Sequence, residues 1–386
     1  MAIRMVHHDG RNYQDAVSEA AKHARGKMEL MLERGAQRTK EAMERVEASV
    51  PTDFMDKGKD LELELKRHEV EGKTIFNLLM QGKYVPGGTT IHRHALGQIR
   101  ERSGAPDMKY IDRMLAGNED QQDRVVDLLN EHLHKDVGDD RNLVRTVNSQ
   151  ALGFLSDQYK RFDSPSLFNL FLDVAQKNGA VLVGGDSTSI RHTMRAFIPH
   201  VFEPVKDEVL CIGVEMLNGD FGGSRFVVRM IINRLWCTNL ATMMHGIKKT
   251  HIGARLPEDV VFSDKTMKLD TELLVSASND VIKSMLQPER VDAVLQAIKT
   301  ASEAELEWRD AEKLLAKHLR KPELEMAQQM FETKQDDPTG PVPPAKSFYK
   351  AAQILSWQAN QVEGERRLDL MQASGQLMDR FLPKAA

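Results

Sequence analysis

The segment "VLCIGVEMLNGDFGGSRFVVRMIINRLW", residues 209–236, decides the predicted fold class. Two apolar runs, 209–217 and 225–236, flank a link rich in Gly, Asn and Asp. Runs rich in Val and Ile that are bounded by such turn residues are typical of β-strands. The link is too short for a crossover helix, so we expect the two strands to pair antiparallel.

Shorter runs of the same kind lie on the N-terminal side of this segment. The sequences "NLVRTV" (142–147), "ALGFLSD" (151–157), "AVLVGG" (180–185) and "IRHTMRAFI" (190–198) are separated by polar links. Between them, Ser164 and Pro165 are typical of a helix start, and Asn178-Gly179 of a helix end. We therefore predict an α+β protein with a mainly antiparallel central sheet packed with helices and flanked by helical N- and C-terminal regions.

The flanking residues divide the chain further. Apolar residues at three- and four-residue spacing predict helices over 12–48, 90–134 and from Pro288, and "DLELELKRHEV" (60–70) alternates as a strand does. The segment "DDPTGPVPPAK" (336–346) cannot be helical. The predicted units are a helical extension plus strand (1–84), a central domain (85–265), a helical region (266–335), a proline-rich linker (336–346) and a C-terminal helix (347–386).

Composition excludes several classes of protein. Of 386 residues, 41% are hydrophobic, which is enough for a substantial core. The two cysteines, Cys211 and Cys237, predict neither a disulfide framework nor a zinc site. No run approaches the roughly 20 apolar residues of a membrane span, and the first residues lack the apolar stretch of a signal peptide. We expect a cytoplasmic protein without membrane contact.

Three blocks of the sequence occur in an order that resembles a family of phage and plasmid proteins. They are "HALGQIRERSGAPDMKYIDRML" (94–115), "RNLVRTVNSQALGFLSDQYKRFD" (141–163) and "IGVEMLNGDFGGSRFVVRMIINRLWCTN" (212–239). The chain resembles this phage/plasmid-like family, domain of unknown function 932, over residues 91–255. It departs from the family at Asn218-Gly219-Asp220 and at Leu240-Ala241. The resemblance implies a mobile-element origin and a shared core domain, with a distant similarity to RecT and Red-beta single-strand annealing proteins.

The run "IRHTMRAFI" (190–198) carries the first candidate site. In a strand, alternation places Arg191, Thr193, Arg195 and Phe197 on one face, opposite an apolar core face. Guanidinium groups for phosphate beside an aromatic ring for bases are typical of a sequence-tolerant nucleic-acid platform. The alternative is an ordinary solvated strand face whose arginine stems cover a neighbour.

A second basic row lies in the segment that decides the fold. Residues 220–256 contain one acidic residue and six basic ones, although the whole chain has a net charge of −4. Arg225, Arg229 and Asn233 recur at four-residue spacing and therefore share a face in either a strand or a helix. Arg234 lies outside that row in a strand, and Glu215 or Asp220 is its expected partner. The other basic residues are Lys248, Lys249 and Arg255.

Two readings of this row remain open. As a groove for a nucleic-acid backbone, it would supply sequence-independent affinity through phosphate contacts. As part of an oligomer, its arginines would pair with carboxylates of a neighbouring subunit. The candidate nucleic-acid-binding residues are Arg191, Arg195, Phe197, Arg225, Arg229, Asn233, Lys248, Lys249 and Arg255.

No catalytic residue, metal site or cofactor site is predicted. The glycine pair Gly184-Gly185 is not followed by Lys-Ser/Thr, so it is no Walker loop, and the turn 218–223 best suits a hairpin tip. The paired histidines at 92/94 and 132/134 point apart in a helix and lack a third ligand nearby. An enzyme is therefore not favoured, and a metal-dependent nuclease is a minor alternative.

The main hypothesis is a phage or plasmid DNA-metabolism protein that binds single-stranded DNA as an oligomer, and its narrower form is a recombination protein that anneals single strands. The alternative is a structural or host-interacting phage protein that forms an oligomer without nucleic acid.

Overall fold

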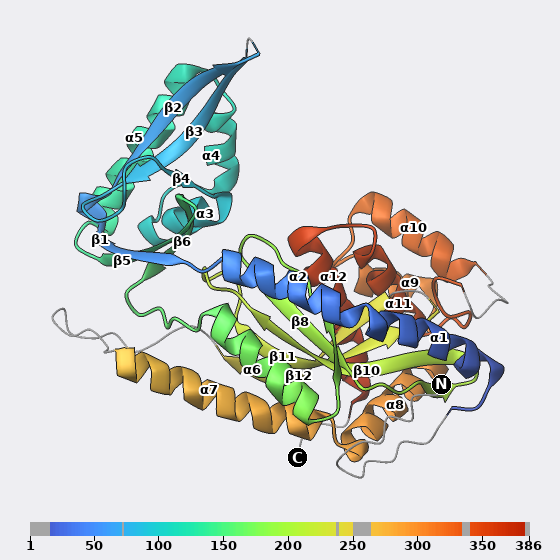
Figure 1. Cartoon of the computed structure of the whole chain (residues 1–386). Coiled ribbons are helices and arrows are strands. Elements are labelled where there is room, and N and C mark those ends of the chain that lie inside the picture. The colour runs from blue at the N-terminus through green and yellow to red at the C-terminus, as the bar shows by residue number, and fades with distance from the viewer. Residues whose placement is uncertain (1–15, 72, 237–238, 250–263, 334–339, 383–386) are drawn as a thin grey trace.

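The chain folds into two lobes of unequal size (Figure 1). The computed structural model describes residues 16–71, 73–236, 239–249, 264–333 and 340–382. Residues between the end of α2 and residue 156 form the small lobe, and the described residues before and after them form the large lobe. The small lobe is thus an insertion, because the chain leaves the large lobe and later returns to it.

The small lobe is a six-stranded sheet covered by three helices. Its strand order is β1-β5-β6-β4-β3-β2, and all neighbours are antiparallel except β4 and β6. The strands are β1 (Thr52–Lys57), β2 (Glu62–Val70), β3 (Lys73–Gln81), β4 (Thr89–Ile91), β5 (Arg141–Val147) and β6 (Gln150–Ser156). The helices are α3 (Arg93–Ser103), α4 (Met108–Leu115) and α5 (Glu119–Asp136), with the short η1 (Gly58–Asp60) between β1 and β2.

Local sequence explains several boundaries of this lobe. The β5–β6 hairpin turns at Asn148 and Ser149, which have φ angles of 49° and 60°. Both central residues of a type I′ turn need positive φ, and Asn tolerates that region well. Asn118 and Gln121 form a capping box at the start of α5, which satisfies two backbone N–H groups that the helix cannot pair.

The large lobe is built on a second antiparallel sheet. Its order is β12-β11-β10-β8-β7, and β9 also pairs with β10. The strands are β7 (Val181–Gly184), β8 (His192–Phe197), β9 (Phe202–Val205), β10 (Glu208–Asn218), β11 (Phe226–Arg234) and β12 (Asn239–Lys249). Every residue of β8 and β10 is buried, because helices cover both faces of this sheet (Figure 1).

The helices of the large lobe come from both ends of the chain. They are α1 (Glu19–Glu33), α2 (Gly35–Ala48), α6 (Ser164–Lys177), α7 (Asp264–Met285), α8 (Pro288–Glu303), α9 (Trp308–Leu315), α10 (Lys321–Glu332), α11 (Phe348–Ala359) and α12 (Gly364–Met378), with the short η2 (Asp379–Phe381). α6 and α7 contact the strands in front of the sheet as Figure 1 shows it, whereas α12 reaches the sheet from behind. One continuous core joins these helices to the sheet.

α1 and α2 form a nearly continuous rod across the large lobe (Figure 1), in which α2 lies against the edge strand β7 and α1 contacts both β7 and β10. The rod breaks at Arg34, and Gly35 then lies against the backbone of β7. A Cβ atom at Gly35 would lie 2.1 Å from the carbonyl oxygen of Leu182. Glycine therefore sets how closely α2 approaches the edge strand, and the rod covers an edge that would otherwise be open to pairing.

The predicted fold class is confirmed: antiparallel-rich sheets are packed against helices from both ends of the chain. The boundary between 84 and 85 differs from the structure, because β3 on one side pairs with β4 on the other. The predicted central domain 85–265 is likewise shared between two sheets, and the single C-terminal helix is in fact two, α11 and α12. Among the described helices, none combines the length and apolarity that a membrane crossing requires.

Candidate nucleic-acid interface

Three of the strands carry a row of charged residues across the large-lobe sheet. Arg195 of β8 and Arg229 of β11 both lie directly opposite Glu215 of β10. The Nε atom of Arg195 donates to Glu215 Oε1 at 2.8 Å, and the Nε atom of Arg229 donates to Glu215 Oε2 at 2.7 Å. All three side chains are buried. One buried carboxylate therefore pairs with two buried guanidinium groups.

Helix α12 covers this row and extends its network. Asp186 accepts from Arg195 at 2.6 Å and lies 3.5 Å from Arg367 of α12. Burial alone would raise the pKa of Asp186, but Arg195 and Arg367 outweigh it and hold the pKa below its usual value. Gln372 of α12 accepts from Arg229 at 3.5 Å. The row is therefore held within one chain, whereas the sequence left open a pairing between subunits.

Arg191 also turns toward α12. It pairs with Glu365 and lies 3.4 Å from Asp369, and its side chain is 13% exposed. Desolvation lowers the pKa of Arg191 despite these carboxylates. Two of the three candidate residues from 190–198, Arg191 and Arg195, are thus engaged by carboxylates of the same chain.

Phe197 and Asn233 are buried as well, which corrects the expectation of an open strand face. Phe197 is 2% exposed, so its ring offers no surface for a base in this structure. Asn233 contacts Met31 of α1, with 3.7 Å between Nδ2 and Sδ. Arg234 pairs with Glu208 at 2.7 Å, and neither Glu215 nor Asp220 is its partner.

The remaining candidate residues lie elsewhere. Arg225 is exposed and stands just before β11, beside the small lobe. Lys248 and Lys249 belong to β12, where their backbones lie opposite Val227 and Phe226. Arg255 lies outside the described residues.

A pocket lies between α1, the sheet and α12 and is called the basic pocket because of the side chains that line it. Its volume is about 400 Å³. Six basic residues line it, and no described acidic residue does; the six are Lys27, Arg34, Arg38, Arg195, Arg234 and Arg367. Among the described residues, Arg195, Arg234 and Arg367 have carboxylate partners, whereas none pairs with Lys27, Arg34 or Arg38. The pocket therefore presents a surplus of positive charge.

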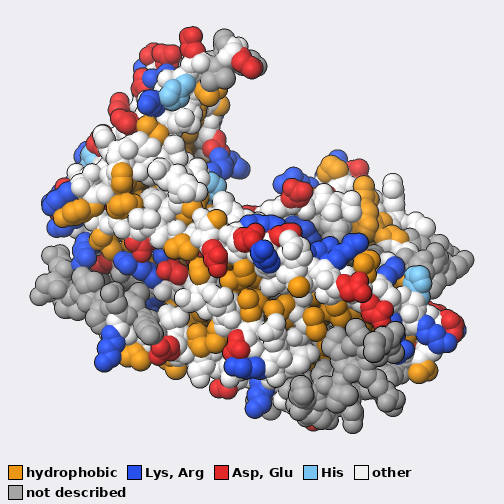
Figure 2. Space-filling view, viewed as in Figure 1, with side chains coloured by type: hydrophobic (Ala, Val, Ile, Leu, Met, Phe, Trp, Pro, Cys, Tyr) orange, Lys and Arg blue, Asp and Glu red, His pale blue; other side chains and the backbone are white. Residues whose placement is uncertain are grey.

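The surplus comes from one stripe of the α1–α2 rod. Lys27, Arg34, Arg38 and Arg45 are exposed and separated by seven, four and seven residues, a spacing that places them on one side of a helix. Figure 2 shows Lys and Arg side chains gathered over α2 and α12, at the base of the hollow between the lobes. Sequence reasoning missed this stripe, although its spacing was available, because the many acidic residues of the same helices conceal it in the local charge.

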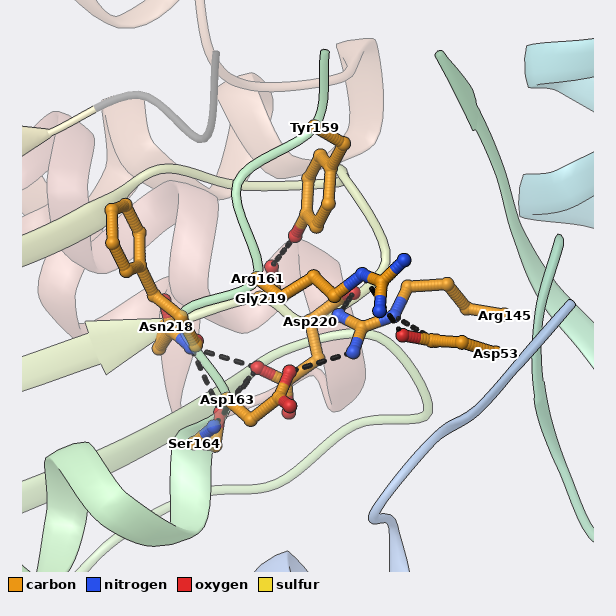
Figure 3. Close-up of polar contacts among 10 residues, drawn as sticks. Asp53, Arg145, Tyr159, Arg161, Asp163, Ser164, Asn218, Gly219 and Asp220 are labelled. Atoms are coloured by element: carbon orange, nitrogen blue, oxygen red, sulfur yellow. Dashed lines mark hydrogen bonds and ion pairs between the residues drawn. The ribbon is translucent and has the colours of Figure 1, made fainter. Parts of the chain in front are cut away.

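The turn between β10 and β11 docks the large lobe onto the small lobe. Three consecutive carbonyl groups of this turn accept hydrogen bonds from side chains, and Figure 3 shows those of Gly219 and Asp220. Tyr159 donates to Gly219 O at 3.1 Å, and Arg145 donates to Asp220 O at 2.6 Å. Gln98 of α3 donates to the carbonyl of Phe221 at 2.8 Å, and the side chain of Phe221 is fully buried.

Arg145 is the central ion of this junction. It comes from β5 and donates to Asp53 of the same lobe and to Asp163 before α6, each at 2.7 Å. Its side chain is 1% exposed, and Tyr159 packs against it with 5.7 Å between the guanidinium carbon and the ring centre. A cation that binds carboxylates of both lobes fixes the lobes relative to each other.

Asp220 lies beside Arg145 and is titratable near neutral pH. Burial, with the nearby charge of Asp163, raises its pKa to about 7 although Arg145 opposes the shift. Its Oδ1 atom accepts from the backbone and hydroxyl of Ser164 and from Asn218 (Figure 3). Its Oδ2 atom is buried without a hydrogen-bond partner among the described residues.

Within the described ranges, no group of three or more His, Cys, Asp or Glu residues is arranged to hold a metal ion. The arrangement instead offers positive charge, because a basic pocket lies beside a stripe of exposed lysine and arginine side chains. No family model, curated protein or solved structure matches the chain, so its resemblance to phage and plasmid proteins stays a prediction.

Proposed function

We propose that this protein binds single-stranded DNA, with phosphates of the strand in the basic pocket and along the stripe of α1–α2. One observation carries the proposal: six basic side chains and no described acidic side chain line the pocket. Phosphate contacts supply most of the sequence-independent affinity for nucleic acids. The surface differs from the predicted one, because Arg195, Phe197 and Arg229 now lie beneath it or in its wall.

The shape of the pocket favours a single strand over a duplex. A recess of about 400 Å³ between a helix and a sheet can receive one phosphate group with its sugar. A single strand bends freely into such a recess, whereas a duplex is stiff over many base pairs. Two aromatic residues line the pocket. Phe197 is buried, and Trp236 already contacts His23 and Lys27, so phosphate binding dominates over base stacking.

Binding by phosphates leaves the base edges free to pair, which is what annealing of two strands requires. Self-association would add affinity by placing several pockets along one strand. Leu269 and Leu273 of α7 support it, because they lie four residues apart and are 55% and 69% exposed. The proposal therefore extends to an oligomer that anneals single strands in phage or plasmid recombination, in the cytoplasm of a bacterial host.

The first test reverses two charges of the stripe. We expect Arg34→Glu with Arg38→Glu to weaken binding of a labelled single-stranded oligonucleotide by at least about 100-fold in ~50 mM salt, since two phosphate contacts become repulsive. Fluorescence anisotropy gives the affinity, and repeating it up to ~200 mM salt gives the number of phosphate contacts through the slope.

A matched control is available on the other side of the same rod. Lys22→Glu with Lys40→Glu makes the same change in net charge at side chains that are 59% and 71% exposed. This control should retain most of the affinity. Equal losses in both double variants would reduce the effect to net charge, and undiminished binding by the Arg34/Arg38 variant would exclude the pocket as the DNA site. An oligomer that ignores added DNA would favour the structural alternative.

A further inference from the structure

A second cleft lies between the two lobes and is separate from the basic pocket. Its volume is about 530 Å³, within the range of small-molecule sites. One wall is formed by α3 and the end of β6, and the other by the turn from Gly222 to Arg225. We infer that this interlobe cleft binds a phosphate-bearing small molecule about the size of a nucleotide.

Two arginines from different lobes give the cleft its chemistry. Arg225 of the large lobe is exposed, and its side chain makes no hydrogen bond or ion pair with any described residue. Arg102 of the small lobe is held in place by Asn142, which accepts from its Nη2 atom at 2.8 Å, and it lies over the ring of Phe154. Planar guanidinium groups bind phosphate through paired N–H donors.

The other polar groups of the cleft suit the rest of such a ligand. Ser156 and Ser224 line the cleft, although the Ser224 hydroxyl itself is buried inside the turn beside Gly219. Glu101 is the one carboxylate among the residues described in the lining, and it can accept from the amino group of a base or from a sugar hydroxyl, neither of which inorganic phosphate has.

The wall that carries Arg225 is fixed by the docking turn. Gly222 has a φ of 75°, and a Cβ atom there would lie 2.4 Å from Leu155 Cδ2 and 2.8 Å from Gln98 Nε2. The turn therefore packs against the small lobe as only glycine allows, with the carbonyl of Phe221 bound by Gln98 and His94. The cleft exists because the lobes are docked, so its ligand contacts both.

The test is calorimetric titration of the full-length protein with deoxyadenosine monophosphate and with inorganic phosphate. We expect the nucleotide to bind more tightly than phosphate, and Arg225→Ala to raise its Kd by at least about tenfold, the loss expected for charged hydrogen bonds. Arg309→Ala, which removes an exposed arginine of α9, should leave the Kd unchanged. Phe221→Ala should also weaken binding, because it loosens the wall while Arg225 remains.

Other outcomes would overturn the inference. Absence of nucleotide binding by the wild-type protein would do so. So would unchanged affinity in Arg225→Ala, or loss of affinity in the Arg34/Arg38 variant, which would assign the nucleotide to the basic pocket. The inference stands apart from the proposed function: nucleotide binding that depends on Arg225 would support it even if no oligonucleotide binds.

Discussion

Asp220 illustrates how a single residue can couple the docking of two lobes to pH. Its carboxylate accepts from the first backbone N–H of α6, and its own carbonyl accepts from Arg145. Because Oδ2 has no partner among the described residues, the buried charge is only partly compensated. The folded protein therefore binds a proton at Asp220 more tightly than the unfolded chain does.

Stability should consequently fall as the pH rises from about 4 to about 7. The pKa is raised from 3.8 to about 7 in the folded state, so the stabilisation is complete below pH 4 and is lost as the pH approaches and passes 7. A shift of this size corresponds to roughly 4 kcal/mol in the free energy of unfolding.

Asp220→Asn should remove this dependence, because an amide keeps the acceptor for Ser164 and Asn218 but never ionises. We expect the variant to match the wild-type Tm at about pH 4 and to exceed it at pH 7.5, as measured by thermal unfolding at both values. The difference between the two proteins isolates Asp220 from all other titrating groups. A difference that does not change with pH would show that Asp220 is ionised in the folded state throughout this range.

At the scale of elements, β10 stabilises the large lobe by placing a buried carboxylate between arginines of its two neighbouring strands, β8 and β11. Glu215 is fully buried and is the carboxylate shared by Arg195 and Arg229. Buried ion pairs add little over an apolar replacement, yet removal of one partner leaves an uncompensated charge in a medium of low dielectric constant.

Glu215→Gln should therefore lower the free energy of unfolding by about 3 kcal/mol or more. Glu44→Gln, which breaks the exposed pair with Lys40 on α2, should change it by less than about 1 kcal/mol. Denaturant titration of both variants gives the comparison. Similarly small losses of unfolding free energy in both variants would mean that water or a change in protonation compensates the charge of the buried arginines.

Several strands of the large-lobe sheet could be predicted from the sequence, whereas the packing of helices over their side chains could not. Alternation and turn residues located β8, β10 and β11, and four-residue spacing rightly placed Arg229 and Asn233 on one face. The pattern could not show that α12, more than a hundred residues later in the chain, covers Arg195 and Arg229. The periodicity of a strand shows which face an arginine lies on, but it does not show whether the partner of that arginine is water, phosphate or a buried carboxylate.

The candidate site was predictable to a similar extent. Of the residues singled out from the sequence, Arg195, Phe197 and Asn233 line the basic pocket, and their role in binding nucleic acid stays a prediction. Lys27, Arg34 and Arg38 were missed because only the tertiary structure brings α1 and α2 beside those strands.

At the scale of the whole molecule, the two lobes have separate cores. The small-lobe core is made of residues between Leu61 and Phe154, and the six strands of this lobe form one sheet of their own. The large-lobe core includes residues before and after that stretch. The sequence could not place this division, because the β2–β3 hairpin shows no local sign that β3 pairs with β4.

The small lobe should accordingly fold when it is produced alone. We expect residues 50–157 to give a cooperative thermal transition and dispersed NMR amide signals, since their core and sheet are complete. Residues 85–157, cut at the boundary suggested by the sequence, lack β1, β2 and β3 and should remain largely unfolded. A disordered spectrum for the longer fragment would mean that docking of Phe221 is required for the lobe to form.

The insertion of the small lobe also sets an order of events during translation. α1 and α2 leave the ribosome before any strand of their sheet exists, because β7 begins only at Val181. The nascent small lobe, whose sheet and core lie within one continuous stretch, can complete its core in that interval. The amphipathic α1–α2 rod cannot pack against its sheet until β7, β8 and β10 have been synthesised. The stretch of chain that presents the cationic stripe is thus the first part of the described structure to be made, yet it packs only after the strands that follow the small lobe have been synthesised.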